Sequence, residues 1–376
     1  MDAVTATLAT RPEDPALQAL AERIRAAGAD GQPLEVRGDG TKGFLGGVPR
    51  GEVLDVRALS GVSAYEPTEL VVTVRAGTPL AELEAALADR GQGLPFEPPR
   101  FGGGGTVGGM VAAGLAGPAR AAMGSVRDYV LGATMLDGRG QLLSFGGQVM
   151  KNVAGYDVSR LLAGSMGVLG VICEVSLKVL PRPVATATLR FDIDEAEAIR
   201  RLNAWGGQPL PLSASAWQAG VLHLRLAGAA AAVEAAARQL GGQPLGADEA
   251  AALWEALRDQ RSAYFADAQR AVDAGGTLWR LSVPQVAPPL ALPGPTLLEW
   301  GGAQRWCHGD LPAERVRAAA AAAGGHATAL RTGDAALRAA GVFAPLAAPL
   351  ERIHRDLKRT FDPAGILNPG RLYPGL

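Results

Sequence analysis

The sequence has few of the residues that build metal centres and redox relays. Its 376 residues include two cysteines, Cys173 and Cys307, and four histidines. An ordinary iron–sulfur cluster needs four thiolates, so this chain alone cannot hold one. Cys173 stands in an apolar run far from Cys307, which predicts a buried free thiol and no disulfide. The cysteine count therefore excludes an iron–sulfur protein.

An excess of charge of either sign is also missing. The chain has 36 Lys and Arg against 37 Asp and Glu, whereas a nucleic-acid partner needs a concentrated basic surface. No run of about 18 apolar residues occurs, so we expect no transmembrane helix. The first residues, MDAVTATLATRPEDP, lack the basic and apolar stretches of a secretory signal. These absences predict a cytoplasmic protein with no nucleic-acid partner.

Glycine, in contrast, is abundant. The chain contains 50 glycines, well above average usage. Residues 98–117, PPRFGGGGTVGGMVAAGLAG, contain the pattern G-x-G-x-x-G at Gly103, Gly105 and Gly108, and Asp128 follows about 20 positions later. In Rossmann domains this pattern forms the turn from a strand into a helix and binds a dinucleotide. The match therefore raises the question of an NAD site.

The residues before the pattern argue against NAD. Prolines at positions 95, 98 and 99 disfavour a central parallel strand directly before the turn. The pattern also follows about one hundred residues of chain, whereas the Rossmann fingerprint usually lies at a domain's first strand. The glycines therefore need another explanation.

A second glycine-rich segment, RGDGTKG at residues 37–43, supplies one. Two such loops can bracket one diphosphate with backbone N–H donors, without needing a lysine. Small residues after the second loop would let another molecule or backbone approach closely. The alternative is a flexible surface loop, and the residues alone leave both interpretations open.

The remaining pattern predicts an α+β protein. Residues 14–28 read as a helix capped by Asp14, and a second helix opens at Thr78 and closes at Gly91. A DGRG turn joins two expected strands within residues 129–145. Alanine-rich helical stretches then alternate with short strands, which is typical of a smaller α+β domain. We expect domains at residues 1–183 and 184–349, and a C-terminal segment at residues 350–376.

The ordered set of glycine-rich segments resembles a known family. RGDGTKG and TVGGMVAAGLAG are similar to the first and second pyrophosphate loops of the FAD-binding family typified by vanillyl-alcohol oxidase and p-cresol methylhydroxylase. GSVRDYVLGATMLDGRGQ, KNVAGYDVSRLLAGSMGVLGVICEVSLKVLP and FDPAGILNPGR resemble its later segments in the same order. The resemblance implies a two-subdomain FAD-binding domain of the p-cresol methylhydroxylase type, a smaller α+β cap domain, and a C-terminal segment that returns to close on the FAD domain.

Further segments extend the resemblance over the whole chain. TLWRLSVP, WGGAQRW, GGHATALR and GVFAPLAAPL are similar to the family of FAD-binding subunits of bacterial glycolate oxidase, also called glycolate dehydrogenase. This similarity implies oxidation of glycolate, a 2-hydroxy acid, to glyoxylate through FAD. It also implies two partners, a second flavin subunit and an iron–sulfur subunit, and membrane association only through such partners.

The resemblance also implies which residues bind FAD. No histidine precedes His223, so the FAD-binding domain offers no histidyl link and we expect non-covalent binding. The position that is often Asn in the family is Gly114 here, and its neighbour, often Thr, is Ala113. Asp39 is an acid in a phosphate loop, so we expect it to point to solvent. The implied cofactor-binding residues are Arg37, Gly38, Gly40, Thr41, Thr106, Gly108, Gly109, Gly114, Gly124, Ser125, Asp128, Gly164, Ser165, Gly167, Gly170, Val171, Asn368 and Gly370.

Catalytic residues are harder to assign. Related D-2-hydroxyacid dehydrogenases carry a metal motif resembling H-x-G-D-G-N-x-H, whereas WCHGD around His308 lacks the second histidine, so we expect no metal. His308 and His326 are candidates to face the flavin, with Arg280 or Arg331 binding a carboxylate. The alternative is that these side chains only support the cap. Lys151, Asn152 and Tyr156 are further candidates, because in the family their segment runs close to the flavin.

Three functions remain open at this point. The first is a flavoprotein subunit of a glycolate oxidase complex that acts with its partners. The second is a self-sufficient FAD-dependent D-2-hydroxyacid or alcohol dehydrogenase that uses its own cap. The third is a scaffold that has lost flavin, and the intact glycine loops argue against it.

Overall fold

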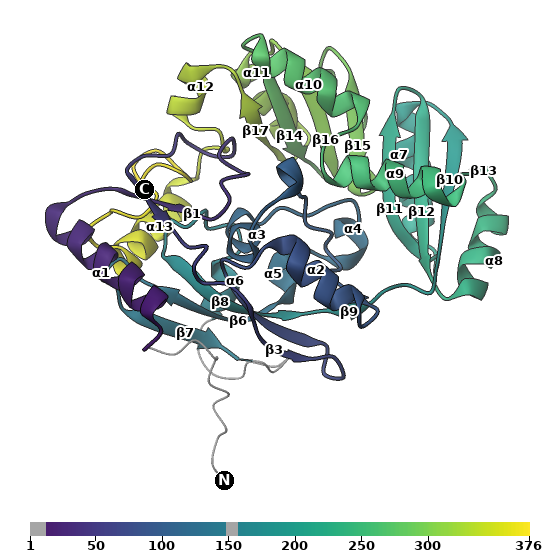
Figure 1. The fold of residues 1–376 in the computed structure, drawn as a ribbon. Coiled ribbons are helices and arrows are strands. Elements are labelled where there is room, and N and C mark those ends of the chain that lie inside the picture. Colours follow the sequence, from purple (N-terminus) through teal and green to yellow (C-terminus); the bar gives the residue numbers. More distant parts are fainter. Residues whose placement is uncertain (1–12, 148–156) are drawn as a thin grey trace.

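The computed structural model describes residues 13–147 and 157–376. Figure 1 shows a five-stranded sheet with its helices in one part of the molecule and a larger, eight-stranded sheet beside it. Both are antiparallel throughout, and helices cover them, so the α+β class is confirmed.

The first described helix, α1 (Pro15–Asp30), forms as its sequence predicts. The carboxylate of Asp14 accepts hydrogen bonds from the N–H groups of Ala16 and Leu17, and Gly31 ends the helix in the left-handed region. Strands β1 (Leu34–Arg37) and β2 (Glu52–Asp55) follow as a parallel pair. The loop between them is the first glycine-rich segment.

The five-stranded sheet forms the core of the N-terminal part. Strands β6 and β8 are buried along almost their whole length, because α1 packs on one face and α2 and α3 on the other. The predicted hairpin is present as β6 and β7. In sheet order the strands are β3 (Val62–Glu66), β4 (Val71–Arg75), β8 (Val171–Lys178), β6 (Val130–Leu136) and β7 (Leu142–Gly146). The helices and short strands are α2 (Leu80–Ala88), α3 (Val107–Ala113), α4 (Arg120–Met123), α5 (Val126–Tyr129), α6 (Val158–Leu161), β5 (Gln92–Gly93) and β9 (Leu180–Pro181).

One predicted helix start is wrong. Helix α2 begins at Leu80 with Pro79 at its N-cap, and Thr78 does not cap it. The hydroxyl of Thr78 donates instead to the carbonyls of Arg75 and Gly61, at 2.7 and 3.2 Å. These bonds fix the turn that leads from β4 toward the helix.

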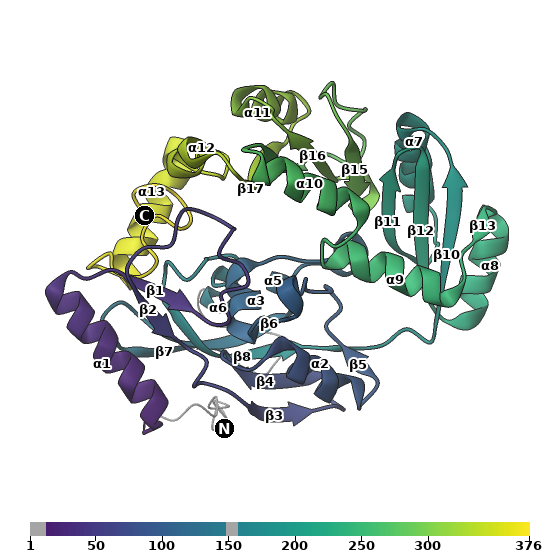
Figure 2. The ribbon, with the colours of Figure 1, turned by 45° about the horizontal axis from the view of Figure 1, so that its top comes forward.

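The second large sheet carries helices on both faces. Helices α7, α8 and α11 cover the outer face, whereas α9 and α10 lie between this sheet and the N-terminal part (Figure 2). In sheet order the strands are β13 (Gln243–Pro244), β10 (Ala185–Asp192), β12 (Val221–Gly228), β11 (Leu212–Gln218), β15 (Thr296–Glu299), β16 (Gln304–Gly309), β14 (Thr277–Ser282) and β17 (His326–Thr332). The helices are α7 (Glu195–Gly206), α8 (Ala230–Leu240), α9 (Ala247–Arg258), α10 (Ala263–Asp273) and α11 (Ala313–Ala322).

The tail returns to the N-terminal part through α12 (Ala335–Ala340) and α13 (Ala348–Phe361). Leu367 bridges to Leu34 at the edge of β1. The ammonium of Lys358 is buried and donates to Asp362 and to the carbonyls of Val168 and Leu367, at 2.6–2.9 Å. The tail therefore lies beside the first glycine loop. The division into domains at residues 183 and 349 stays a prediction.

Candidate functional site

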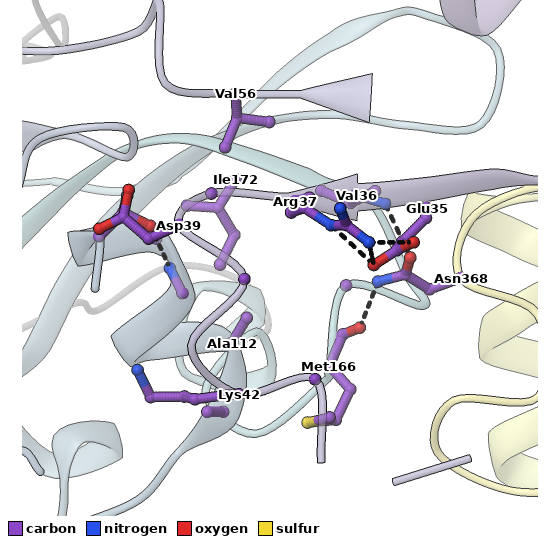
Figure 3. A pocket seen from close by; sticks show the side chains of 18 of the residues that line it. Glu35, Val36, Arg37, Asp39, Lys42, Val56, Ala112, Met166, Ile172 and Asn368 are labelled. Carbon is purple, nitrogen blue, oxygen red and sulfur yellow. Dashed lines mark hydrogen bonds and ion pairs between the residues drawn. The ribbon is translucent and has the colours of Figure 1, made fainter. Parts of the chain in front are cut away.

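The two glycine-rich loops lie opposite each other and line one cavity (Figure 3). The first loop leaves the end of β1, and the second leads into α3. The cavity is open to solvent, and the space between its lining residues together with its mouth is about 830 Å³. Ten of the predicted cofactor-binding residues line it: Arg37, Gly38, Gly40, Thr41, Thr106, Gly108, Gly109, Gly167, Gly170 and Asn368.

The first loop presents unpaired backbone donors. Among the described residues, nothing accepts a hydrogen bond from the N–H groups of residues 38–42. Gly40 has φ 72°, a left-handed conformation that glycine adopts without strain. Successive free N–H groups around such a residue form an anion-binding concavity. The first loop therefore fits a phosphate group through its backbone.

A close approach between the loops explains one glycine. A Cβ at Gly38 would lie 2.8 Å from Cγ2 of Thr106 and closer still to its Oγ1. The same Oγ1 accepts from the N–H of Gly109 at 3.2 Å and caps α3. Only glycine at position 38 leaves room for the first loop to pass the Thr106 side chain.

The second loop differs from its prediction. Its N–H groups are largely used inside the protein: Gly105 donates to Asp39 at 2.8 Å, and Gly108 donates to the carbonyl of Ala76 at 2.7 Å. A Cβ at Gly108 would meet the Cβ of Ala76 at 2.7 Å, so this glycine serves helix-to-strand packing. The expectation that both loops offer N–H donors to one diphosphate is therefore wrong for Gly108.

The charged groups of the first loop have different partners. The guanidinium of Arg37 pairs with Glu35 through hydrogen bonds of 2.8–3.0 Å. Asp39 is exposed, as expected, but its carboxylate also links the two loops through Gly105. Burial lowers the pKa of Lys42 to about 8, and the nearby charge of Asp39 partly opposes this shift. Lys42 lines the cavity and did not figure among the predicted site residues, although it stands in the same motif.

The tail closes one side of the cavity. Asn368 accepts a hydrogen bond from the N–H of Val36 at 2.8 Å and donates to the carbonyl of Met166 at 2.7 Å. Its amide thus joins β1 to the segment before β8. Gly167 is tightly placed, because a Cβ there would lie 2.7 Å from the Nδ2 of Asn368.

The sequence of this chain is similar to proteins of known name. Residues 11–146 match the FAD binding domain family. Over 359 residues the chain is 48% identical to glycolate oxidase subunit GlcE of Escherichia coli K12, which covers 96% of this chain and 98% of that protein. The chain belongs to the GlcE family. The resemblance inferred from its sequence motifs is thereby confirmed.

Two further comparisons extend this result. The chain is 31% identical over 159 residues to glycolate oxidase subunit GlcD of Bacillus subtilis, which covers 42% of this chain and 34% of GlcD. A solved structure of alkyldihydroxyacetonephosphate synthase superposes with a TM-score of 0.64 at 14% identity, covering 94% of this chain and 76% of that one. The first supports an FAD-linked oxidoreductase, and the second shows the fold.

The cavity of this GlcE-family chain fits FAD. The cofactor's diphosphate supplies the negative charge and oxygen acceptors that the unpaired N–H groups of residues 38–42 lack. When bound, FAD accepts a hydride on its flavin ring. The ten predicted residues that line the cavity stay predictions as cofactor-binding residues, and Lys42 lines the cavity beside them.

Eight predicted cofactor residues do not line this cavity. They are Gly114, Gly124, Ser125, Asp128, Gly164, Ser165, Val171 and Gly370. The carboxylate of Asp128 accepts from the N–H and the hydroxyl of Ser125, which forms a helix cap. Val171 is fully buried beneath α1, and Gly370 donates to the carbonyl of Leu376. Local structure explains these residues, so their cofactor contacts stay a prediction.

Three of the eight lie around a close backbone contact. Gly164 donates to the carbonyl of Val111, and a Cβ at Gly114 would lie 2.8 Å from the Cα of Gly164. Ser165 follows, with a buried hydroxyl that has no hydrogen-bond partner among the described residues. This hydroxyl favours a ligand contact outside the cavity.

The two catalytic histidine candidates lie apart. His308 pairs with Leu278 and His326 with Ser282, at opposite ends of β14. The ring of His308 packs edge-on against Tyr264 with centroids 5.0 Å apart, and burial lowers its pKa. His326 begins an edge strand and is exposed. The structure does not bring them together into one acid–base site.

The two arginine candidates also differ. Arg331 stacks on Phe44 and Phe101 and donates to Gln260 and Gln269, so it packs against the glycine loops and is not free to bind a carboxylate. The guanidinium of Arg280 has no hydrogen-bond or ion-pair partner among the described residues, although its backbone pairs within the sheet. Burial lowers its pKa to about 10, and the positive charge of Arg120 acts in the same direction.

Within residues 13–147 and 157–376, no three His, Cys, Asp or Glu side chains are grouped so that they could bind a metal ion. Lys151, Asn152 and Tyr156 lie outside the described residues.

Cys173 and Cys307 are both buried and free, and burial raises the pKa of each thiol to about 12.

Proposed function

We propose that this chain is the FAD-binding subunit of a glycolate oxidase complex that takes part in the oxidation of glycolate to glyoxylate. The observation that carries the proposal is the 48% identity to GlcE over nearly the whole chain. The unpaired N–H groups of the first glycine loop support FAD as its cofactor. We further propose that FAD is held without a covalent bond, since no histidine precedes His223 in the sequence; a covalent link from the C-terminal half of the chain is the alternative.

The proposed complex includes a second flavin subunit and an iron–sulfur subunit. The names of both GlcE and GlcD describe them as subunits of glycolate oxidase. Electrons that leave a flavin in this chain need an acceptor, and its two buried cysteines cannot build an iron–sulfur relay. Among the described residues, no helix is long and apolar enough to cross a membrane. We place the chain in the cytoplasm, with membrane contact made by partner subunits.

The test compares the chain alone with the chain co-expressed with both partners. Flavin bleaching and dye reduction are followed anaerobically after mixing with glycolate or D-lactate. We expect the isolated chain to bind FAD but to bleach slowly or not at all, and the complex to turn over. Rapid bleaching of the isolated chain by either acid would overturn the need for partners.

Whether FAD is covalently attached can be measured separately. Acid precipitation of the yellow protein should release the flavin into the supernatant, because backbone hydrogen bonds do not survive unfolding. Flavin that stays with the pellet would contradict the prediction.

One observation favours a second candidate, a self-sufficient 2-hydroxyacid dehydrogenase. Arg280 is a cation without a partner among the described residues, as a site for a substrate carboxylate requires. If this function is correct, Arg280→Met abolishes bleaching of the isolated chain by glycolate while FAD content is unchanged. An isolated chain that never bleaches removes this candidate.

A further inference from the structure

The cavity contains a cation whose counter-charge is missing. The ammonium of Lys42 contacts Oγ1 of Thr41 at 3.5 Å and lies 5.8 Å from the centroid of the Phe101 ring. No carboxylate of the described residues forms an ion pair with it. Withdrawing an ammonium from water is unfavourable, and the charge of Asp39 offsets this desolvation only in part.

The other cations that line the cavity are already engaged. Arg37 is paired with Glu35. The guanidinium of Arg371 donates to the backbone carbonyls of Lys42, Gly43 and Gly47, so its donors are engaged by the chain itself. Lys42 is therefore the lining cation, among the described residues, whose donors are available to a ligand.

The position of the ammonium matches the anion site. Lys42 ends the run of residues 38–42 whose N–H groups are unpaired. Its Nζ lies 3.4 Å from the point where a Cβ of Gly105 would stand, so it sits between the two glycine loops. Figure 3 shows Lys42 and Asp39 on the same side of the cavity.

We propose that Lys42 donates a charge-assisted hydrogen bond to the diphosphate of FAD and supplies the counter-charge of this site. The proposal rests on the proposed function, in that FAD is the ligand. It assigns the neutralisation of phosphate to one side chain of the first loop, in addition to the backbone donors. The second loop then contributes shape, since its N–H groups at Gly105 and Gly108 are occupied.

The proposal makes FAD affinity dependent on pH. Burial lowers the pKa of Lys42 to about 8 and Asp39 raises it. Two further cations contact neighbours of the ammonium: Arg331 stacks on the same Phe101 ring, and Arg371 donates to the backbone carbonyl of Lys42. A bound diphosphate raises the pKa of Lys42, so binding above about pH 8 requires uptake of a proton. Affinity is then constant below about pH 7 and falls as pH rises above about 8, by at most tenfold per unit.

The test measures the dissociation constant of FAD on apoprotein by quenching of flavin fluorescence between about pH 6.5 and 9. Lys42→Gln should bind FAD roughly tenfold to a hundredfold more weakly at pH 7, with no dependence on pH. Lys42→Arg keeps the positive charge, so it should bind FAD over this whole pH range, without the fall in affinity expected for the native chain. Lys178→Gln, which changes a lysine outside the cavity, is the control and should behave as the native chain. Thermal melts of the apoproteins check that each variant is folded.

A second variant tests the cause of the pH dependence. Asp39→Asn keeps an oxygen acceptor for Gly105 and removes the charge that raises the pKa of Lys42. The decline in affinity should therefore begin at lower pH than in the native chain.

Calorimetry in buffers of different ionisation enthalpy should show proton uptake near pH 8.5 for native protein and none for Lys42→Gln. A folded Lys42→Gln that binds FAD as tightly as the native chain overturns the proposal and leaves the proposed function intact. A native chain that binds no FAD overturns both.

Discussion

Glycines of the two glycine-rich loops have different structural roles, because each has different neighbours. Gly38 lets the first loop pass the hydroxyl of Thr106, and Gly108 lets α3 pack on Ala76. Gly109 is less constrained, since a Cβ there would meet only the Oγ1 of Thr106, at 3.2 Å. A side chain at each position therefore disturbs the site to a different extent.

Gly38→Ala is expected to lower FAD occupancy strongly, because the new methyl group displaces the loop from Thr106 at an overpacking cost of about 1–3 kcal/mol. The measurement is flavin content per protein after purification. Gly206→Ala, at the end of α7 with open space around it, is the matched control. Adding Thr106→Ala to Gly38→Ala should restore part of the occupancy, and a failure to recover would argue against the steric cause.

At the scale of elements, buried charges decide how the tail and the cap are held. The last turn of α13 carries Lys358, whose side chain is 7% exposed and which joins Asp362 to two carbonyls of other segments. Strand β15 ends at Glu299, which is buried and accepts from Gln304 and Trp306 at 2.9 and 2.6 Å. Removing one partner of such a group costs more than removing a surface ion pair.

Lys358→Met is expected to destabilise the protein by about 3–5 kcal/mol, because the carboxylate of Asp362 loses its buried counter-charge. Urea unfolding gives the free energy directly. The neighbouring Arg359 is exposed, so Arg359→Met should change stability by no more than about 0.5 kcal/mol. Equal losses in the two variants would show that Lys358 does not hold the tail.

Glu299 makes stability depend on pH. Burial raises its pKa from 4.5 to about 7, with Glu97 acting in the same direction. The folded protein therefore binds a proton that the unfolded chain releases, and stability falls as pH rises from about 4.5 to 7, by at most about 3 kcal/mol. Glu299→Gln should remove this decline and stabilise the protein at pH 8 in thermal melts. Glu314→Gln, on the exposed side of α11, serves as control. A native chain whose stability does not change over this range contradicts the prediction.

At the scale of the whole molecule, β17 and α12 hold the first glycine loop. Arg338 of α12 donates to the carbonyls of Gly43 and Gly46 at 2.6 and 3.3 Å. Arg331 of β17 stacks on Phe44 and Phe101. The first glycine loop is thus shaped by segments nearly three hundred residues further along the chain.

Arg338→Met should release FAD faster, by roughly fivefold to thirtyfold, because the loop loses two hydrogen bonds that fix its carbonyls. Stopped-flow fluorescence of flavin release measures the rate. The control is Arg352→Met, an exposed arginine on α13. A release rate equal to that of the native chain would mean that the loop keeps its shape without the Arg338 hydrogen bonds.

Much of this protein follows from its sequence alone. Capping by Asp14, the hairpin of β6 and β7, the alanine-rich helices and the α+β class all follow from local patterns, because caps, turns and side-chain periodicity act within a few residues. The prolines before the second loop correctly argued against a Rossmann strand, and Phe101–Gly103 forms a 3₁₀ turn there. The FAD cofactor was predicted from the order of the glycine-rich segments along the chain.

Only the tertiary structure decided which glycine-loop groups are free to bind. The N–H of Gly108 is taken by Ala76 and that of Gly105 by Asp39, partners 32 and 66 positions away. The lack of an ion-pair partner for Lys42 likewise depends on how side chains meet after folding, whereas Arg37 pairs with Glu35 only two positions away. A motif specifies which donors and charges are present. Whether each one faces a ligand is determined by the long-range contacts that satisfy the others first.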